Sequence, residues 1–216
     1  MVTNRDIDWV IRTLKRLVRR WEEPIVGHYR GDPFTTLISC LLSLRTKDAT
    51  TRDASQRLFR LARNPRRMVR LSTRTIERAI YPVGFYRTKA RTVRAVCRDL
   101  LFRYRGRVPD DLDELLTIKG VGRKTANLVV TLAFRKPGIC VDTHVHRISN
   151  RWGYVRTKTP EQTEMALRRT LPPGYWRIYN DLLVTFGQNL CHPTSPWCSR
   201  CPLERMCAKV GVTYSR

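Results

Sequence analysis

The sequence lacks the long apolar runs that a membrane protein needs. No stretch of about 18 apolar residues occurs in the chain of 216 residues, which excludes a membrane-spanning helix. Its first six residues are largely polar or charged, and they lack the apolar core of a signal peptide. Internal repeats and low-complexity tracts are missing as well. We therefore expect a soluble, cytoplasmic protein with no membrane partner.

Acidic residues are scarce. The chain has 18 Asp and Glu against 42 Lys and Arg, so its formal net charge is +24, spread over the whole length. Of the cationic side chains, 34 are arginine, whose planar fork binds phosphate in a bidentate manner. A lineage that favours arginine would explain the ratio of Arg to Lys, but not the shortage of acid. Nucleic acid is the predicted partner, and an acidic membrane surface is the main alternative.

Strand-like alternation of apolar and polar residues is missing at any useful length. Apolar residues instead recur at helical spacing, and 42% of the residues are hydrophobic, enough to bury a core. The expected fold class is therefore all-α. Residues 34–44 are almost entirely apolar, which predicts a central helix buried on most sides. Other helices are expected from residue 7 to before Pro24 and at 46–61, 73–80, 88–102, 109–116, 123–134, 143–152, 161–170 and 176–190.

Four of the seven cysteines form a cluster near the C-terminus. Their spacing is C-x6-C-x2-C-x5-C, whereas the other three stand singly among apolar neighbours as small buried side chains. An odd total without a secretory signal argues against disulfides and for a metal centre. Zinc and an iron-sulfur cluster both accept four thiolates, and a single compact loop suits the cluster better. The clustered residues are Cys191, Cys198, Cys201 and Cys207.

Two glycines flank Val121 between the helices expected at 109–116 and 123–134. Gly120 and Gly122 are predicted to let the turn adopt positive φ and to let the backbone approach a ligand closely. The N–H groups that open the second helix form an anion site, and Arg123 and Lys124 follow at once. This pattern predicts a contact with a DNA phosphate, and an ordinary turn between helices is the alternative.

Three motifs in order resemble the endonuclease III family of base-excision DNA glycosylases. They are the segment 116–127 with Gly120-Val121-Gly122, the segment 141–144 with Asp142, and the four-cysteine run. The resemblance extends over most of the chain. It implies an all-α, two-domain helix-hairpin-helix glycosylase fold with a C-terminal iron-sulfur loop at 191–207. Residues 26–136 would form a helical barrel domain, and residues 1–25 plus 137–216 the cluster domain, with a cleft between them.

The same resemblance assigns the catalytic residues. It implies that Lys124 is the nucleophile, that Asp142 is its partner, and that the four clustered cysteines hold a [4Fe-4S] cluster. A neutral lysine amine can attack C1′ of a damaged nucleotide and form a Schiff base, which serine cannot do. Taken alone, Lys124 would be a phosphate contact, and Asp142 would be the N-cap of the helix that follows it.

Chemistry on a base requires that the base leave the stack, so a side chain has to fill the gap. By the resemblance, Phe85 and Tyr86 occupy the wedge region, with Arg45 on the other side in place of the usual glutamine. The predicted DNA contacts also include His144, a DNA-facing or packing residue. The hairpin supplies the others, which are Gly120, Val121, Gly122 and Arg123.

The function implied is that of a bifunctional DNA glycosylase and abasic-site lyase. It would remove oxidised or ring-saturated pyrimidines from damaged duplex DNA as a monomer at the nucleoid. A mismatch-specific or adenine-specific relative is an alternative, but such relatives lack the hairpin lysine. An 8-oxoguanine glycosylase shares the lysine and typically lacks the cluster. A non-catalytic DNA-binding module is the alternative from another class.

Overall fold

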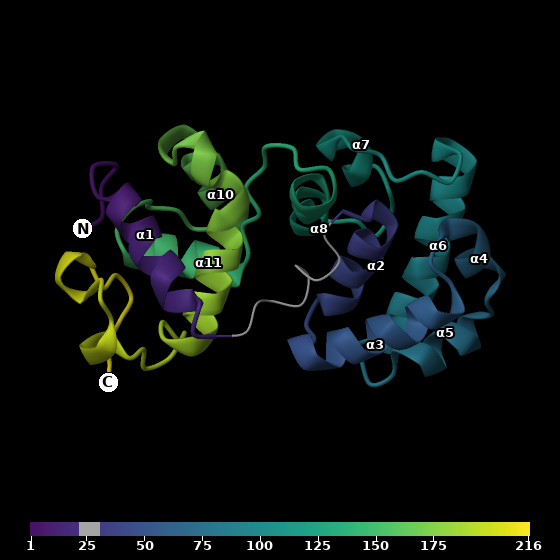
Figure 1. Cartoon of the computed structure of the whole chain (residues 1–216), viewed down its shortest axis with the longest axis horizontal. Coiled ribbons are helices and arrows are strands. Elements are labelled where there is room, and N and C mark those ends of the chain that lie inside the picture. Colours follow the sequence, from purple (N-terminus) through teal and green to yellow (C-terminus); the bar gives the residue numbers. More distant parts are fainter. Residues whose placement is uncertain (22–30) are drawn as a thin grey trace. The chain divides into compact units, whose positions relative to one another are not determined.

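The computed structural model describes residues 1–21 and 31–216, and all regular structure in these ranges is helical (Figure 1). The prediction of an all-α fold is confirmed. The chain divides into two compact units. We call Ile25–Lys136 the hairpin unit, and Met1–Pro24 together with Pro137–Arg216 the cysteine unit. The boundary predicted between residues 25 and 26 lies outside the described residues.

The hairpin unit is built around α2, which spans Pro33–Ser43. Residues 34–42 of this helix are all buried, as the apolar run predicts. Asp32 caps the helix by accepting hydrogen bonds from the backbone N–H groups of Phe34 and Thr35, and Pro33 opens it. The remaining helices are α3 (Asp48–Leu61), α4 (Pro65–Arg70), α5 (Thr73–Ile80), α6 (Tyr86–Tyr104), α7 (Leu112–Leu116) and α8 (Arg123–Leu128), which continues into a π-helical turn at Val129–Ala133.

The cysteine unit packs α1 (Ile7–Val18) against α11 (Trp176–Asn189), and α9 (Thr143–Arg151) against both α10 (Pro160–Thr170) and α11. Its core contains three large, fully buried aromatic side chains, Trp152, Tyr179 and Phe186. The rings of Trp152 and Phe186 lie 6.2 Å apart between centroids. After α11 the chain makes only short 3-10 turns, at Cys198–Arg200 and Glu204–Met206.

Two sequence expectations about helices need correction. Asn64 and Pro65 end one helix, as expected, but they also begin α4, which was not predicted. The Asn64 side chain accepts a hydrogen bond from the Arg67 N–H at 2.9 Å, and Pro65 is the first helical residue. The helix expected over 123–134 is α-helical only to Leu128. No described helix is both long and apolar enough to cross a membrane.

Candidate functional site

The turn between α7 and α8 requires glycine at Gly120. Its φ is +96°, and a Cβ there would lie 2.6 Å from Cγ2 of Thr92 on α6. Gly122 has φ −90° and serves as the N-cap residue of α8, and a Cβ at this position would meet no atom within 4 Å. The expectation of positive φ is therefore right for Gly120 and wrong for Gly122. What Gly122 provides is an uncovered backbone directly before α8.

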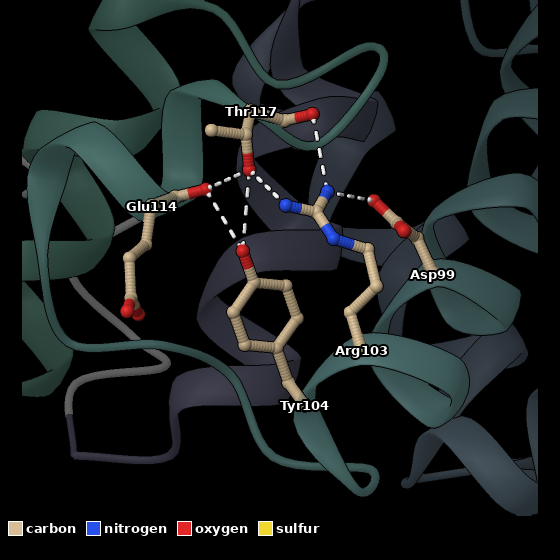
Figure 2. Close-up of polar contacts among 5 residues, drawn as sticks. All are labelled: Asp99, Arg103, Tyr104, Glu114 and Thr117. Atoms are coloured by element: carbon tan, nitrogen blue, oxygen red, sulfur yellow. Dashed lines mark hydrogen bonds and ion pairs between the residues drawn. The ribbon is translucent and has the colours of Figure 1, made fainter.

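A set of polar contacts joins the end of α7 to the end of α6 (Figure 2). Arg103 donates to the Thr117 hydroxyl at 2.8 Å and to the Thr117 carbonyl at 3.4 Å, and it forms an ion pair with Asp99 at 3.2 Å. Tyr104 lies within hydrogen-bonding distance of the Thr117 hydroxyl and donates to the Glu114 carbonyl. Thr117 itself donates to the Glu114 carbonyl at 2.7 Å. Helix α6 thus fixes the backbone segment that leads into the glycine turn.

Lys124 is the second residue of α8 and is half-buried. Helix α8 packs on α2, where Cys40 is buried. Burial raises the pKa of the Cys40 thiol to about 12, and the charge of Lys124 opposes this shift. Arg123 is also half-buried, whereas the Val121 side chain is only 5% exposed and belongs to the core. Val121 can therefore offer a partner little besides its backbone.

Asp142 is the N-cap residue of α9 in the cysteine unit. Its side chain is buried, and Oδ1 accepts hydrogen bonds from the N–H groups of His144 at 2.9 Å and Val145 at 3.0 Å. The capping role is therefore present, and it fixes the direction of the carboxylate. His144 is half-buried, with Nδ1 3.2 Å from Nη2 of Arg147, and it packs against α11 at Gly187. Lys124 and Asp142 belong to different units, and their approach to each other stays a prediction.

We call the loop that carries Arg45 and the loop that carries Phe85 the two wedge loops, and they meet in the hairpin unit. Arg45 and Phe85 both adopt left-handed backbone conformations, with φ of 52° and 58°. The guanidinium carbon of Arg45 lies 5.9 Å from the centroid of the Phe85 ring, which is 64% exposed. Tyr86, the first residue of α6, is half-buried and packs edge-on against Tyr81 at 5.4 Å. Of the two predicted wedge residues, Phe85 is therefore the one that projects.

The four clustered cysteines line one cavity. A tetrahedral zinc site would hold all four sulfur atoms about 2.3 Å from a single point. Among the described residues, no three His, Cys, Asp or Glu side chains are grouped closely enough to hold a single ion. The apolar wall of the cavity is built from Trp152, Phe186, Leu190, Pro196, Trp197 and Val212.

A buried arginine faces this cavity. Arg151 is 4% exposed and donates to Sγ of Cys191 at 3.3 Å, to the His192 carbonyl at 2.8 Å and to the Pro193 carbonyl at 3.1 Å. Its Nε is buried without a hydrogen-bond partner. Burial raises the pKa of the Cys201 thiol to about 12, so thiolates form here only with compensating positive charge. The residues present fit a thiolate-bound cluster, because a buried cation is already in place beside one sulfur atom.

Sequence reasoning missed two functional candidates, Arg151 and Lys89. Arg151 is the last residue of α9 and is buried. Lys89 lies on the apolar face of α6 together with Val93 and Val96, and all three are buried. A lysine at helical spacing from buried valines is a signal that could have marked it.

Comparisons with known proteins agree with these features. The HhH-GPD superfamily of base excision DNA repair proteins matches residues 38–173. Endonuclease III of Thermotoga maritima is 45% identical over 193 residues, which are 89% of this chain and 89% of the relative. A solved non-covalent complex of endonuclease III with DNA matches with a TM-score of 0.87 at 35% identity, covering 97% of both chains. A trapped covalent intermediate of endonuclease III with DNA gives the same values.

Replacing Thr117 by Val tests the contacts of Figure 2. We expect the free energy of unfolding to fall by about 1 kcal/mol, because Arg103 and Tyr104 lose a shared partner. Urea denaturation measures the change. The matched control is Thr50→Val on α3, since no hydrogen bond of the Thr50 hydroxyl occurs among the described residues. Equal losses in the two variants would contradict the anchoring role.

The two glycines of the turn should respond differently to alanine. Gly120→Ala places a Cβ at positive φ and against Thr92, so we expect a loss of about 1 kcal/mol or more in the free energy of unfolding. Gly122→Ala should change it by less than about 0.5 kcal/mol, because the position is open. Urea denaturation of both variants gives the comparison. A larger loss at Gly122 would refute this account of the turn.

Proposed function

This chain belongs to the HhH-GPD superfamily of base excision DNA repair proteins, and within it to the endonuclease III family, and from this premise we propose how its residues carry out the reaction. The family activity is that of a bifunctional DNA glycosylase and abasic-site lyase. We assign to this chain oxidised or ring-saturated pyrimidines in duplex DNA as substrates. The enzyme works as a monomer on the DNA inside the cell.

Lys124 is the proposed nucleophile. Its neutral amine attacks C1′ of the damaged nucleotide, the bond from C1′ to the base breaks, and the base leaves with a proton. The sugar ring opens to give a Schiff base between Nζ and C1′. Loss of a proton from C2′ then expels the 3′ phosphate by β-elimination, and water releases the lysine. The single observation that carries this proposal is the position of Lys124, half-buried in the first turn of the helix after the glycine turn.

Asp142 is the proposed partner of Lys124. A carboxylate can accept the proton of the attacking amine and stabilise the positive charge that develops on the sugar. The N–H groups of His144 and Val145 hold Oδ1 of this carboxylate at the start of α9. Its orientation is therefore set before substrate arrives, which reduces the reorganisation that the reaction requires.

The hairpin and the wedge loops are the proposed DNA contacts. The open backbone at Gly122 and the N–H groups of Arg123 and Lys124 are suited to a phosphate. Phe85 and Arg45 project from adjacent loops and are suited to fill the space of a flipped base. Val121 contributes through its backbone. His144 stays a proposed contact, with its ring already engaged by Arg147.

We further propose that the cysteine cavity holds a [4Fe-4S] cluster through Cys191, Cys198, Cys201 and Cys207. The buried Arg151 beside Cys191 supports a centre bound by thiolates. The single compact loop that carries all four cysteines supports a cluster over a single zinc ion. When bound, the cluster supplies a structural link between four points of the C-terminal loop. Arg151 stabilises the thiolate form of Cys191 by donating to its sulfur.

Borohydride trapping on a duplex with one thymine glycol tests the nucleophile. We expect wild type to form a covalent adduct with DNA, and Lys124→Ala to form none while keeping its fold and much of its DNA affinity. Lys119→Ala is the control, because Lys119 is exposed on the same hairpin and should leave trapping intact. An adduct that persists in Lys124→Ala would refute the assignment.

The same gel separates the alternatives. If wild type binds the thymine glycol duplex without an adduct, a duplex with a preformed abasic site is tested next. An adduct there points to another lesion as the substrate. No adduct on either duplex points to a non-catalytic DNA-binding module.

Metal analysis of anaerobically purified protein tests the cluster. We expect about four iron atoms per chain with broad visible absorption, and stoichiometric zinc would contradict the proposal. Arg151→Met should speed the loss of iron to a chelator by about tenfold or more, because it removes a donor to a ligating sulfur. Arg205→Met is the control, since Arg205 is exposed on the same loop.

A further inference from the structure

Lys89 is a buried cation that the mechanism above does not use. Its side chain lies on α6 and is 8% exposed. Nζ donates to the carbonyl oxygen of Leu42 at 2.7 Å, to that of Leu44 at 2.5 Å and to the hydroxyl of Thr46 at 3.1 Å. Burial lowers the pKa of Lys89 to about 8. In its protonated form the amine has three N–H donors, which match the three acceptors.

These acceptors surround one of the two wedge loops. Leu42 lies near the end of α2, and Leu44 and Thr46 flank Arg45 on both sides. A single ammonium group therefore fixes the backbone before and after the residue whose side chain projects. Two of the acceptors are backbone carbonyl groups. The bonds therefore fix the path of the backbone through this loop.

The same group of atoms reaches the second wedge loop. The Thr46 hydroxyl also accepts a hydrogen bond from the backbone N–H of Gly84 at 3.2 Å. The two backbones are so close that a Cβ on Gly84 would lie 2.6 Å from the carbonyl oxygen of Arg45. Phe85 follows Gly84 directly. The Lys89 ammonium thus connects the backbones that carry Arg45 and Phe85.

Both projecting residues have an uncommon backbone conformation. Arg45 and Phe85 are left-handed, at φ of 52° and 58°, and neither is a glycine. Such conformations persist only where the surroundings impose them, and they are frequent at functional sites. The contacts from Lys89 to the first loop and from Thr46 to the second are surroundings of this kind. Without them, each loop can relax to an ordinary conformation and turn its side chain away.

We propose that Lys89 is a positioning residue for base extraction, which ties the loops of Arg45 and Phe85 together so that both side chains enter the duplex as one unit. This inference rests on the proposed function, in which those two side chains fill the space of the flipped base. Lys89 acts through them and touches no reacting atom. Its effect is therefore confined to the step that takes the damaged base out of the stack.

A comparison of two substrates tests this role. Lys89→Met keeps the apolar length of the side chain and removes all three donors. We expect single-turnover excision of thymine glycol to fall by about tenfold to a hundredfold, the size of effect that a displacement of about 1 Å produces. Cleavage of a duplex with a preformed abasic site should stay close to wild type, because no base has to be extracted. A lysine that only stabilises the fold would lower both activities together.

Two further variants complete the test. Lys47→Met removes an exposed charge just beyond Thr46 and should leave both activities unchanged. Thr46→Val removes the hydroxyl that Lys89 and Gly84 share and should show the same selective loss of excision to a smaller degree. If Lys89→Met does not fold in a thermal unfolding assay, Thr46→Val decides the question alone.

The outcomes separate this inference from the proposed function. Selective loss of excision in Lys89→Met or Thr46→Val, with Lys47→Met active, supports the positioning role. Equal loss of both activities, or loss of neither, overturns it while the proposed function stands. A wild-type protein that cleaves neither the thymine glycol duplex nor the abasic duplex overturns the proposed function, and with it this inference.

Discussion

Buried and half-buried cations that bond to backbone carbonyl oxygens hold the loops of the candidate site in place. The chain has 18 Asp and Glu for 42 Lys and Arg, so pairing with acid cannot reach every cation. Lys89 bonds to carbonyl groups at the end of α2, Arg57 to those of Ala79 and Tyr81 at the end of α5, and Arg151 to those of His192 and Pro193 beyond α11. Carbonyl groups at helix ends carry partial negative charge and lack partners within the helix. They are the natural acceptors for cations that a core with little acid must satisfy.

This arrangement also explains where the projecting residues lie. A helix end whose carbonyl groups a cation has satisfied leaves the next few residues free to turn sharply and point outward. Arg45 follows the end of α2 in this way, and Phe85 follows the turn after α5. The burial of α2 gives these loops a rigid base, because nine consecutive residues of that helix, 34–42, are buried. The surface thus carries these two side chains, which we propose contact DNA, on loops that the interior fixes.

Much of the fold follows from local rules that the sequence displays. Asp32, Asp111 and Asp142 each cap the helix that follows them, and the apolar spacing marks the faces that become buried. The start of α4 at Asn64 and Pro65 follows from the same rules, but those residues also read as a break. Gly122 shows the limit of local reasoning, because the sequence cannot tell a glycine needed for its conformation from one needed for its open surface.

The parts that sequence did not predict depend on contacts between distant segments. Lys89 meets Leu42 across 47 positions of the chain, and Arg151 meets Cys191 across 40. A cation is exposed by default, and only the assembled core shows that these two are not. The four cysteines were recognisable as a set, whereas the arginine beside them was visible only once α9 and the C-terminal loop were folded together.

Helix α9 links the two proposed centres of the cysteine unit. Asp142 caps its first turn, and Arg151 ends it at the cysteine cavity. Nine residues at about 1.5 Å of rise per residue form one short, stiff rod. The contacts from Arg151 to the C-terminal loop hold one end of this rod, and the packing of α9 on α11 holds its side. The direction of the Asp142 carboxylate therefore depends on the same packed helix that closes the cysteine cavity, although the two sites share no side chain.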